Sequence, residues 1–360
     1  MLRPLQALSG ALLGAVVAAS GACAHLPDLG NLSYLAPREV RGSMLYAAAR
    51  APQAAPPDAT HPSLTLNEVQ LKGSHNSYHR APRIALARSW RYSHAPLETQ
   101  LSAQGVRQFE LDVRLSKGEL RVAHLPLVDG RSTCSRLVDC LGTIKTWSRA
   151  HGGHLPVFVF IEVKEDLAPS TLEGRLDAID FAITRVFTRD QLLMPEDVAR
   201  DAPSLKQAIV EHGWPSIEDT RGRIAFVMFG PKRHKRAYSA GRPRLDGRVM
   251  FVAERETDHP HTSVVFYDHP ILDRAEIDKA VASHFLVRTR ADEDLRRDVT
   301  RRDAALASGA NFISSDFVDP RYGWLELGPH AAGRCTPASV KLGCTPMALS
   351  EDVPSSLATR

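Results

Sequence analysis

The sequence predicts an α/β protein in which parallel strands close into a (β/α)8 barrel, irregular on one side. From residue 66 onward, short apolar runs rich in β-branched residues alternate with amphipathic stretches. Buried parallel strands have such uninterrupted apolar runs, and eight of them with interleaved helices favour a barrel over a sandwich. The predicted strands are 68–73, 108–113, 157–163, 224–229, 249–253, 264–267, 285–288 and 312–315.

Helical segments are predicted where apolar residues recur at helical spacing between these strands. They cover 137–150, 171–186, 204–211, 272–282 and 292–308. The links before residues 249 and 264 contain no convincing helix, so we expect the barrel to be incomplete or irregular there. Residues 121–124 form an additional extended segment, and the strand–helix pattern fades after residue 319.

The N-terminus has the features of an export signal. A positive start, an apolar Ala/Gly-rich stretch and small residues near position 24 predict a signal peptide over 1–24. Cleavage after Ala24, which the sequence favours, releases a secreted or periplasmic protein, whereas cleavage before Cys23 leaves a lipid-anchored one. Residues 25–64 form an Ala- and Pro-rich lead-in.

Four cysteines remain beyond Cys23, and an even number in an exported chain indicates disulfides. The simplest pairing joins Cys134 to Cys140 and Cys335 to Cys344, and neither spacing is typical of structural zinc. We therefore expect a catalytic barrel over 65–320 and a disulfide-stapled tail over 321–360.

The formal net charge of +4 is small for 360 residues. A basic run at 232–236 predicts a solvated loop, with contact to an anionic surface as the alternative. No helix-turn-helix, finger or aromatic–basic strand pattern supports nucleic-acid binding. The sequence indicates no protein partner.

Polar side chains cluster at the ends of the first three predicted strands, where barrel enzymes place their active sites. Glu110 and Asp112 lie two apart and therefore point to the same side of their strand. Three carboxylates and an amide are hard oxygen ligands that suit Ca²⁺, or less well Mg²⁺. The candidate metal ligands are Asn76, Glu110, Asp112 and Glu162.

The competing interpretation of these carboxylates is an ordinary ion pair with Arg114, Lys164 or another arginine inside the barrel. Three carboxylates at one point repel each other unless a cation neutralises them, which favours the metal. His75 and His124 suit general acid–base catalysis, so the set indicates metal-assisted phosphodiester chemistry. Eight other histidines are interpreted as packing or surface residues: His79, His94, His151, His154, His259, His261, His269 and His284.

Four motifs resemble a known family. They are Ser74-His75-Asn76-Ser77-Tyr78, Glu110-Leu111-Asp112, Ala123-His124 and Ile161-Glu162-Val163-Lys164. Together they resemble the catalytic TIM barrel of phosphoinositide-specific phospholipase C, within the PLC-like phosphodiesterases. The secreted bacterial calcium-dependent type is the most similar, over about residues 66–317.

The resemblance implies cleavage of phosphatidylinositol at a membrane surface into diacylglycerol and a cyclic inositol phosphate. It implies that His75 and His124 are the acid–base pair and that Asn76, Glu110, Asp112 and Glu162 hold Ca²⁺. Lys164 then contacts a phosphate oxygen or else balances Glu162. The later strand ends offer two further candidates for headgroup contacts, Arg288 and Asp316.

Three other functions stay open at this stage. Glycerophosphodiester hydrolysis uses a similar barrel, but its usual first motif is His-Arg-Gly, whereas this chain has His75-Asn76-Ser77. A phospholipase D-like activity uses the same architecture. A catalytically inactive lipid-headgroup binding protein is the non-enzymatic alternative.

Overall fold

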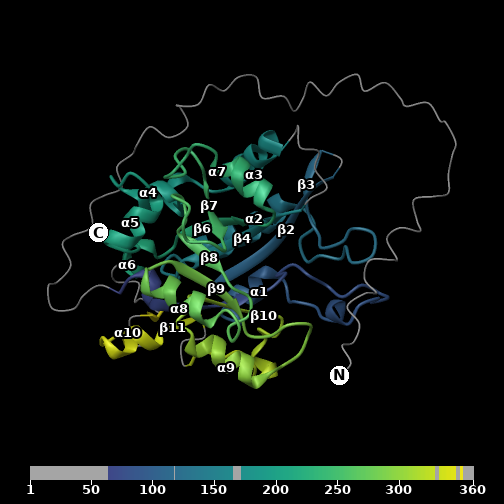
Figure 1. The fold of residues 1–360 in the computed structure, drawn as a ribbon. Coiled ribbons are helices and arrows are strands. Elements are labelled where there is room, and N and C mark those ends of the chain that lie inside the picture. The colour runs from purple at the N-terminus through teal and green to yellow at the C-terminus, as the bar shows by residue number, and fades with distance from the viewer. Residues whose placement is uncertain (1–63, 117, 165–171, 329–331, 346–348, 352–360) are drawn as a thin grey trace, which may run out of the picture. The chain divides into compact units, whose positions relative to one another are not determined.

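The computed structural model describes residues 64–116, 118–164, 172–328, 332–345 and 349–351. Eight parallel strands each pair with two neighbours, and pairing of the first with the second closes the ring (Figure 1). The (β/α)8 prediction is therefore confirmed; the ring is closed rather than incomplete, and the link between residues 254 and 264 contains no described helix, as the sequence predicts. The barrel strands are β1 (Val69–Ser74), β2 (Gln108–Ser116), β4 (Val157–Val163), β6 (Ile224–Phe229), β7 (Met250–Glu254), β8 (Val264–Phe266), β9 (Leu286–Arg290) and β10 (Phe312–Ser315).

Three short strands lie outside the ring. They are β3 (Glu119–Val122), β5 (Leu192–Leu193) and β11 (Gly333–Cys335). β3 pairs antiparallel with the carboxyl half of β2, and it contains residues 121 and 122 of the additional extended segment 121–124 that the sequence predicts. β11 pairs antiparallel with β1 and β5 parallel with β6.

Helices occupy most of the links between barrel strands (Figure 1). They are α1 (Leu97–Ser102), α2 (Leu137–Ala150), α3 (Leu172–Val186), α4 (Pro195–Ala199), α5 (Leu205–His212), α6 (Ile217–Thr220), α7 (Lys232–Ser239), α8 (Arg274–Ala282) and α9 (Val299–Ala307). A further helix, α10 (Pro337–Lys341), follows β11. α9 begins seven residues later than predicted because the Asp298 carboxylate accepts hydrogen bonds from the backbone N–H groups of Thr300 and Arg301. No described helix is long and apolar enough to cross a membrane.

The basic run 232–236 belongs to α7, so the prediction of a solvated loop is wrong. His234 and Lys235 are buried. The Lys235 ammonium pairs with Glu254 on β7, and a His234 ring nitrogen lies 3.0 Å from the Val163 carbonyl oxygen. These contacts pack the helix onto the barrel in a link where the sequence indicated none.

The barrel interior changes character along its axis. Near the amino ends of the strands it is aromatic, with the Phe158 and Phe312 rings 4.7 Å apart and Phe160 5.4 Å from Phe312. Side chains two residues further along a strand lie on the same face. Glu162, two residues after Phe160, therefore faces the interior near the carboxyl ends, beside its register partner Asp112.

Gly73, near the end of β1, lies against the Gln108 side chain. A Cβ at this position would lie 2.0 Å from the Gln108 side-chain oxygen. Any larger residue would therefore displace the Gln108 side chain, which packs between β1 and β2, the two strands that close the ring.

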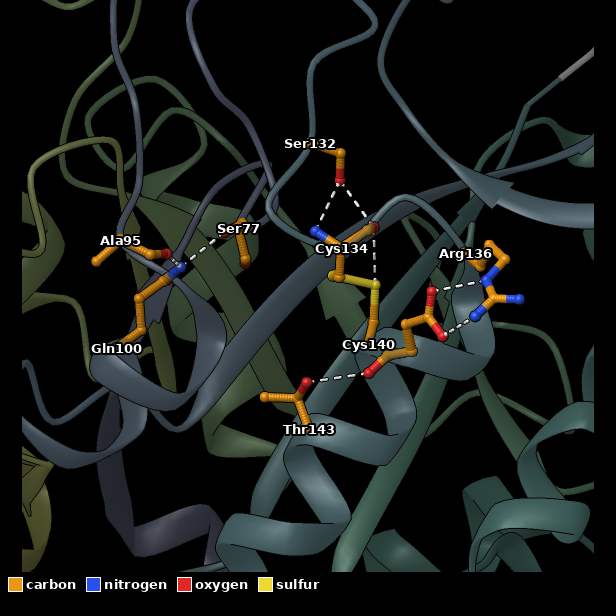
Figure 2. Close-up of a disulfide and its surroundings, with 9 residues drawn as sticks. Ser77, Ala95, Gln100, Ser132, Cys134, Arg136, Cys140 and Thr143 are labelled. Carbon is orange, nitrogen blue, oxygen red and sulfur yellow. Dashed lines mark hydrogen bonds and ion pairs between the residues drawn. A yellow bond between two sulfur atoms is a disulfide. The ribbon is translucent and has the colours of Figure 1, made fainter.

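Both expected disulfides form, Cys134–Cys140 and Cys335–Cys344. The first links the loop after β3 to the first turn of α2, where the Ser132 hydroxyl also donates to the Cys134 carbonyl oxygen at 2.8 Å (Figure 2). The second joins β11 to the segment after α10. The predicted signal peptide, and the predicted lead-in up to residue 63, lie outside the described residues.

Candidate active site

The turn that carries His75 and Asn76 is fixed to the neighbouring strand. The Ser77 N–H donates to the Glu110 carbonyl oxygen at 2.9 Å, and the Ser77 hydroxyl oxygen accepts from the Glu110 N–H at 2.7 Å. Asn76 adopts a left-handed conformation with φ 44°, which asparagine tolerates better than most residues. The sharp turn places both polar side chains at the mouth of the barrel.

The His75 ring is held from several directions. Its Nδ1 lies 2.7 Å from Asp316 Oδ1, and its Nε2 lies 3.6 Å from Glu110 Oε1. Burial and the positive charge of Arg290 hold the pKa of His75 well below its ordinary value of 6.5. The ring is therefore neutral near pH 7, with the Nδ1 proton donated to Asp316 and the Nε2 lone pair left as an acceptor.

His124 follows β3 and also has its own carboxylate. Its Nδ1 lies 2.8 Å from Asp129 Oδ2, and the other oxygen of Asp129 lies 2.8 Å from His79 Nε2. Asp129 is completely buried. The backbone N–H of Asp129 donates to the Leu125 carbonyl oxygen at 2.7 Å, which folds the intervening residues into a tight loop.

One cleft of about 190 Å³ brings the two histidines together. Its walls include His75, Asn76, His124 and the carboxylates Asp129 and Asp316. In both His75 and His124, Nδ1 is therefore bound to a carboxylate, and Nε2 is the ring nitrogen available for proton transfer in the cleft.

The acidic cluster that the sequence predicts is also assembled. Oxygens of Glu110, Asp112 and Glu162 lie within 4.8 Å of one another. Lys164 Nζ lies 2.9 Å from Asp112 Oδ2 and 2.7 Å from Glu162 Oε2, while Arg288 Nη2 lies 2.6 Å from Glu110 Oε2. The three carboxylates thus share two cationic side chains, so pairing with Lys164 and with an arginine does occur.

Two of these carboxylates are electrostatically strained. Burial raises the pKa of Glu110, although Arg288 opposes the shift. Burial and the negative charge of Glu162 raise the pKa of Asp112 to about 6, against the opposing effect of Lys164. An added cation at this place would relieve the repulsion and favour the ionised forms.

The donor set fits a hard divalent cation. It offers three carboxylates, and the side chain of Asn76, which is 7% exposed, lines the adjoining cleft with His75. Oδ1 of Asp112 is buried and accepts no hydrogen bond from any residue that the structure describes, which leaves an oxygen available to a metal. Arg114 donates to the His124 carbonyl oxygen at 2.8 Å.

Several residues of the site were not predicted from the sequence. Asp129 and Arg290 were missed, and His79 was interpreted as a packing or surface residue. Arg288 and Asp316 were expected to contact the headgroup, which stays a prediction. In the structure Arg288 binds Glu110 and Asp268, and Asp316 binds His75 and Arg290.

His94 was also interpreted as a packing or surface residue. Its Nε2 lies 2.8 Å from the His75 carbonyl oxygen. Asp129 had a local sequence signal, since it precedes Gly130 in a turn five residues after His124.

Two histidines held by carboxylates beside an acidic cluster, at the mouth of a (β/α)8 barrel, define a metal-assisted phosphodiesterase class. A profile of the family described as phosphoinositide phospholipase C, Ca²⁺-dependent, matches residues 64–119 and 113–332. The chain therefore belongs to this family of calcium-dependent, phosphoinositide-specific phosphodiesterases and is an enzyme.

Solved structures agree with the fold. The calcium-dependent phosphoinositol-specific phospholipase C of a Gram-negative Pseudomonas species has a TM-score of 0.58 and 18% identity, covering 76% of this chain and 96% of that one. The Ca²⁺-dependent phosphatidylinositol-specific phospholipase C of Streptomyces antibioticus has a TM-score of 0.55 and 18% identity, covering 73% and 97%. No curated protein matches the chain.

Proposed function

We propose that this enzyme cleaves phosphatidylinositol into diacylglycerol and a cyclic inositol phosphate. The observation that carries the proposal is the cleft in which His75 and His124 each have Nδ1 fixed by a carboxylate, beside an acidic cluster. His75 is the general base, because its ring, which is 21% exposed, is neutral and its Nε2 can accept the proton of the inositol 2-hydroxyl.

His124 is the general acid. The Asp129 carboxylate, 2.8 Å from Nδ1, stabilises the protonated ring and leaves the Nε2 proton for the departing diacylglycerol oxygen. When the inositol 2-oxygen attacks phosphorus, the bond from phosphorus to the diacylglycerol oxygen breaks. Diacylglycerol leaves as the alcohol, and the cyclic inositol phosphate remains. Both proton transfers then use Nε2 atoms facing one cleft.

Ca²⁺ is the cation that Asn76, Glu110, Asp112 and Glu162 would hold. When bound, it supplies positive charge that stabilises the phosphate in the transition state and makes the 2-hydroxyl more acidic. Lys164 separates Asp112 from Glu162 and is near enough to the cluster to contact a phosphate oxygen of the substrate.

The test is diacylglycerol release from phosphatidylinositol, measured with chelator and after Ca²⁺ is added back. We expect loss of activity with chelator and recovery with Ca²⁺. His75→Ala and His124→Ala should each lower kcat by about 10²- to 10⁴-fold, whereas His212→Ala, an exposed histidine at the end of α5, should retain activity.

Retained cleavage in either active-site variant would refute the assigned roles. Cleavage of glycerophosphoinositol in place of phosphatidylinositol would favour glycerophosphodiester hydrolysis, and cleavage of sphingomyelin would favour the phospholipase D-like activity. Binding without turnover would favour a headgroup-binding role.

We also propose that the enzyme is exported. Its two disulfides support this proposal, since such bonds persist in oxidising compartments. Mass spectrometry of the mature protein from culture fractions distinguishes release after residue 24 from lipidation at Cys23. A full-length, reduced protein in the cytoplasm would refute export.

A further inference from the structure

His79 lies in the interior of the protein, on the segment that follows the turn after β1. Its side chain is 1% exposed, and its ring stacks on the ring of Tyr92 with the centroids 4.3 Å apart. The His79 N–H donates to the Asn76 carbonyl oxygen at 2.8 Å, and the His79 carbonyl oxygen accepts from the His94 N–H at 2.9 Å. The ring is therefore fixed in place, although the proposed reaction assigns it no role.

Backbone pairing brings this segment against the loop after His124. The Thr133 N–H donates to the Tyr78 carbonyl oxygen at 2.8 Å. The Arg80 N–H donates to the Arg131 carbonyl oxygen at 3.2 Å. These two bonds flank the buried histidine on either side and hold its segment against the loop that carries the partner of the general acid.

That partner, Asp129, is shared between two rings. Its Oδ1 lies 2.8 Å from His79 Nε2, and its Oδ2 lies 2.8 Å from His124 Nδ1. An ionised carboxylate only accepts hydrogen bonds, so each ring nitrogen that faces it carries a proton. The other nitrogen of His79, Nδ1, is buried and has no hydrogen-bond partner in the described part of the chain. Among the described residues, Asp129 is therefore the polar partner of this ring.

We propose that His79 is a positioning residue for the general acid, an inference that rests on the proposed function. By donating to Oδ1, the ring prevents rotation of the buried Asp129 carboxylate and keeps Oδ2 directed at His124. A buried charged group that loses a hydrogen-bond donor is destabilised, so without His79 the carboxylate would turn away or take up a proton. In either case His124 would lose the negative charge that stabilises its protonated form.

Two substitutions of nearly equal size separate the hydrogen bond from the packing. His79→Gln keeps an N–H donor for Asp129, whereas His79→Met has a side chain of similar length without one. Both variants lose the stacking on Tyr92, so the difference between them reports the hydrogen bond. We expect His79→Met to cleave phosphatidylinositol with a kcat roughly tenfold below that of His79→Gln, as for the loss of one hydrogen bond to a charged group.

A second substrate distinguishes positioning of the acid from general damage to the fold. In a nitrophenyl ester of inositol phosphate, the leaving group is acidic enough to depart without a proton, so the general acid is dispensable. We therefore expect the two variants to differ by less than about twofold on this ester. A purely structural role would slow cleavage of both substrates alike. His154→Met removes an equally buried histidine before β4 and should leave the ratio of the two rates as in the wild type.

His124→Ala, assayed on the same two substrates, separates this inference from the proposed function. Wild-type cleavage of phosphatidylinositol by that variant, or no cleavage by the wild type itself, would refute the proposed reaction and this inference with it. If His124→Ala is slow on phosphatidylinositol while His79→Met and His79→Gln have equal kcat, the reaction stands and the positioning role of His79 is overturned.

Nitrogen NMR of the labelled wild-type protein provides a test that needs no stable variant at position 79. Contacts with the Tyr92 ring identify the His79 signals. We expect the proton on Nε2, where it is donated to Asp129. A proton on Nδ1 alone would leave His79 unable to donate to the carboxylate and would overturn the proposal.

Discussion

Asp129→Asn is the sharpest test of how the site is positioned. The carboxylate is completely buried and lies 2.8 Å from a ring nitrogen of both His124 and His79. An asparagine keeps the size of the side chain but removes the negative charge that stabilises protonated His124. A hydrogen bond to a charged group contributes about 1.5–3 kcal/mol, so we expect kcat to fall roughly 10- to 100-fold.

The assay is steady-state cleavage of phosphatidylinositol across the pH range, with KM and kcat determined separately. KM should change little, because Asp129 acts through His124. Circular dichroism and the melting temperature establish that the variant is folded. A folded variant with unchanged kcat would refute the reasoning.

Three further predictions concern other parts of the molecule. Lys164→Met removes the ammonium shared by two metal-ligand candidates, so calorimetry should show tighter Ca²⁺ binding together with lower stability of the ion-free protein; weaker binding would contradict this. Burial lowers the pKa of His154 to about 4 from 6.5, so its contribution to stability is complete above pH 6.5 and is lost as pH falls through 4. Chemical denaturation should show a loss of up to about 3 kcal/mol from this residue, absent in His154→Gln. Replacing Cys134 and Cys140 by serine should cost about 2 kcal/mol of stability and lower kcat, since the bridge anchors the loop after His124; equal kcat would show that the loop needs no anchor.

The barrel strands were predictable because buried parallel strands have an uninterrupted apolar sequence. The predicted strands 157–163, 224–229 and 312–315 coincide with β4, β6 and β10. The basic helix α7 was missed because Lys235 is buried only through its ion pair with Glu254 on β7. Contacts of this kind have no local sequence signature.

In the candidate site, too, some residues could be predicted from local sequence and others depend on contacts between distant parts of the chain. Glu110, Asp112 and Glu162 could be expected to converge because they end neighbouring strands. The partner of Glu110 is Arg288, 178 residues away, and that of His75 is Asp316, 241 residues away. Asp129 is near His124 in sequence, but its second hydrogen bond depends on how two loops pack.

The change from aromatic to charged side chains along the barrel axis has a consequence for engineering. The cluster of Phe158, Phe160 and Phe312 fills one end of the interior. The apolar packing that stabilises the barrel there is therefore separate from the charged side chains of the candidate site. Substitutions at the open end can therefore adapt the enzyme to another phosphodiester headgroup while the aromatic plug preserves the architecture beneath.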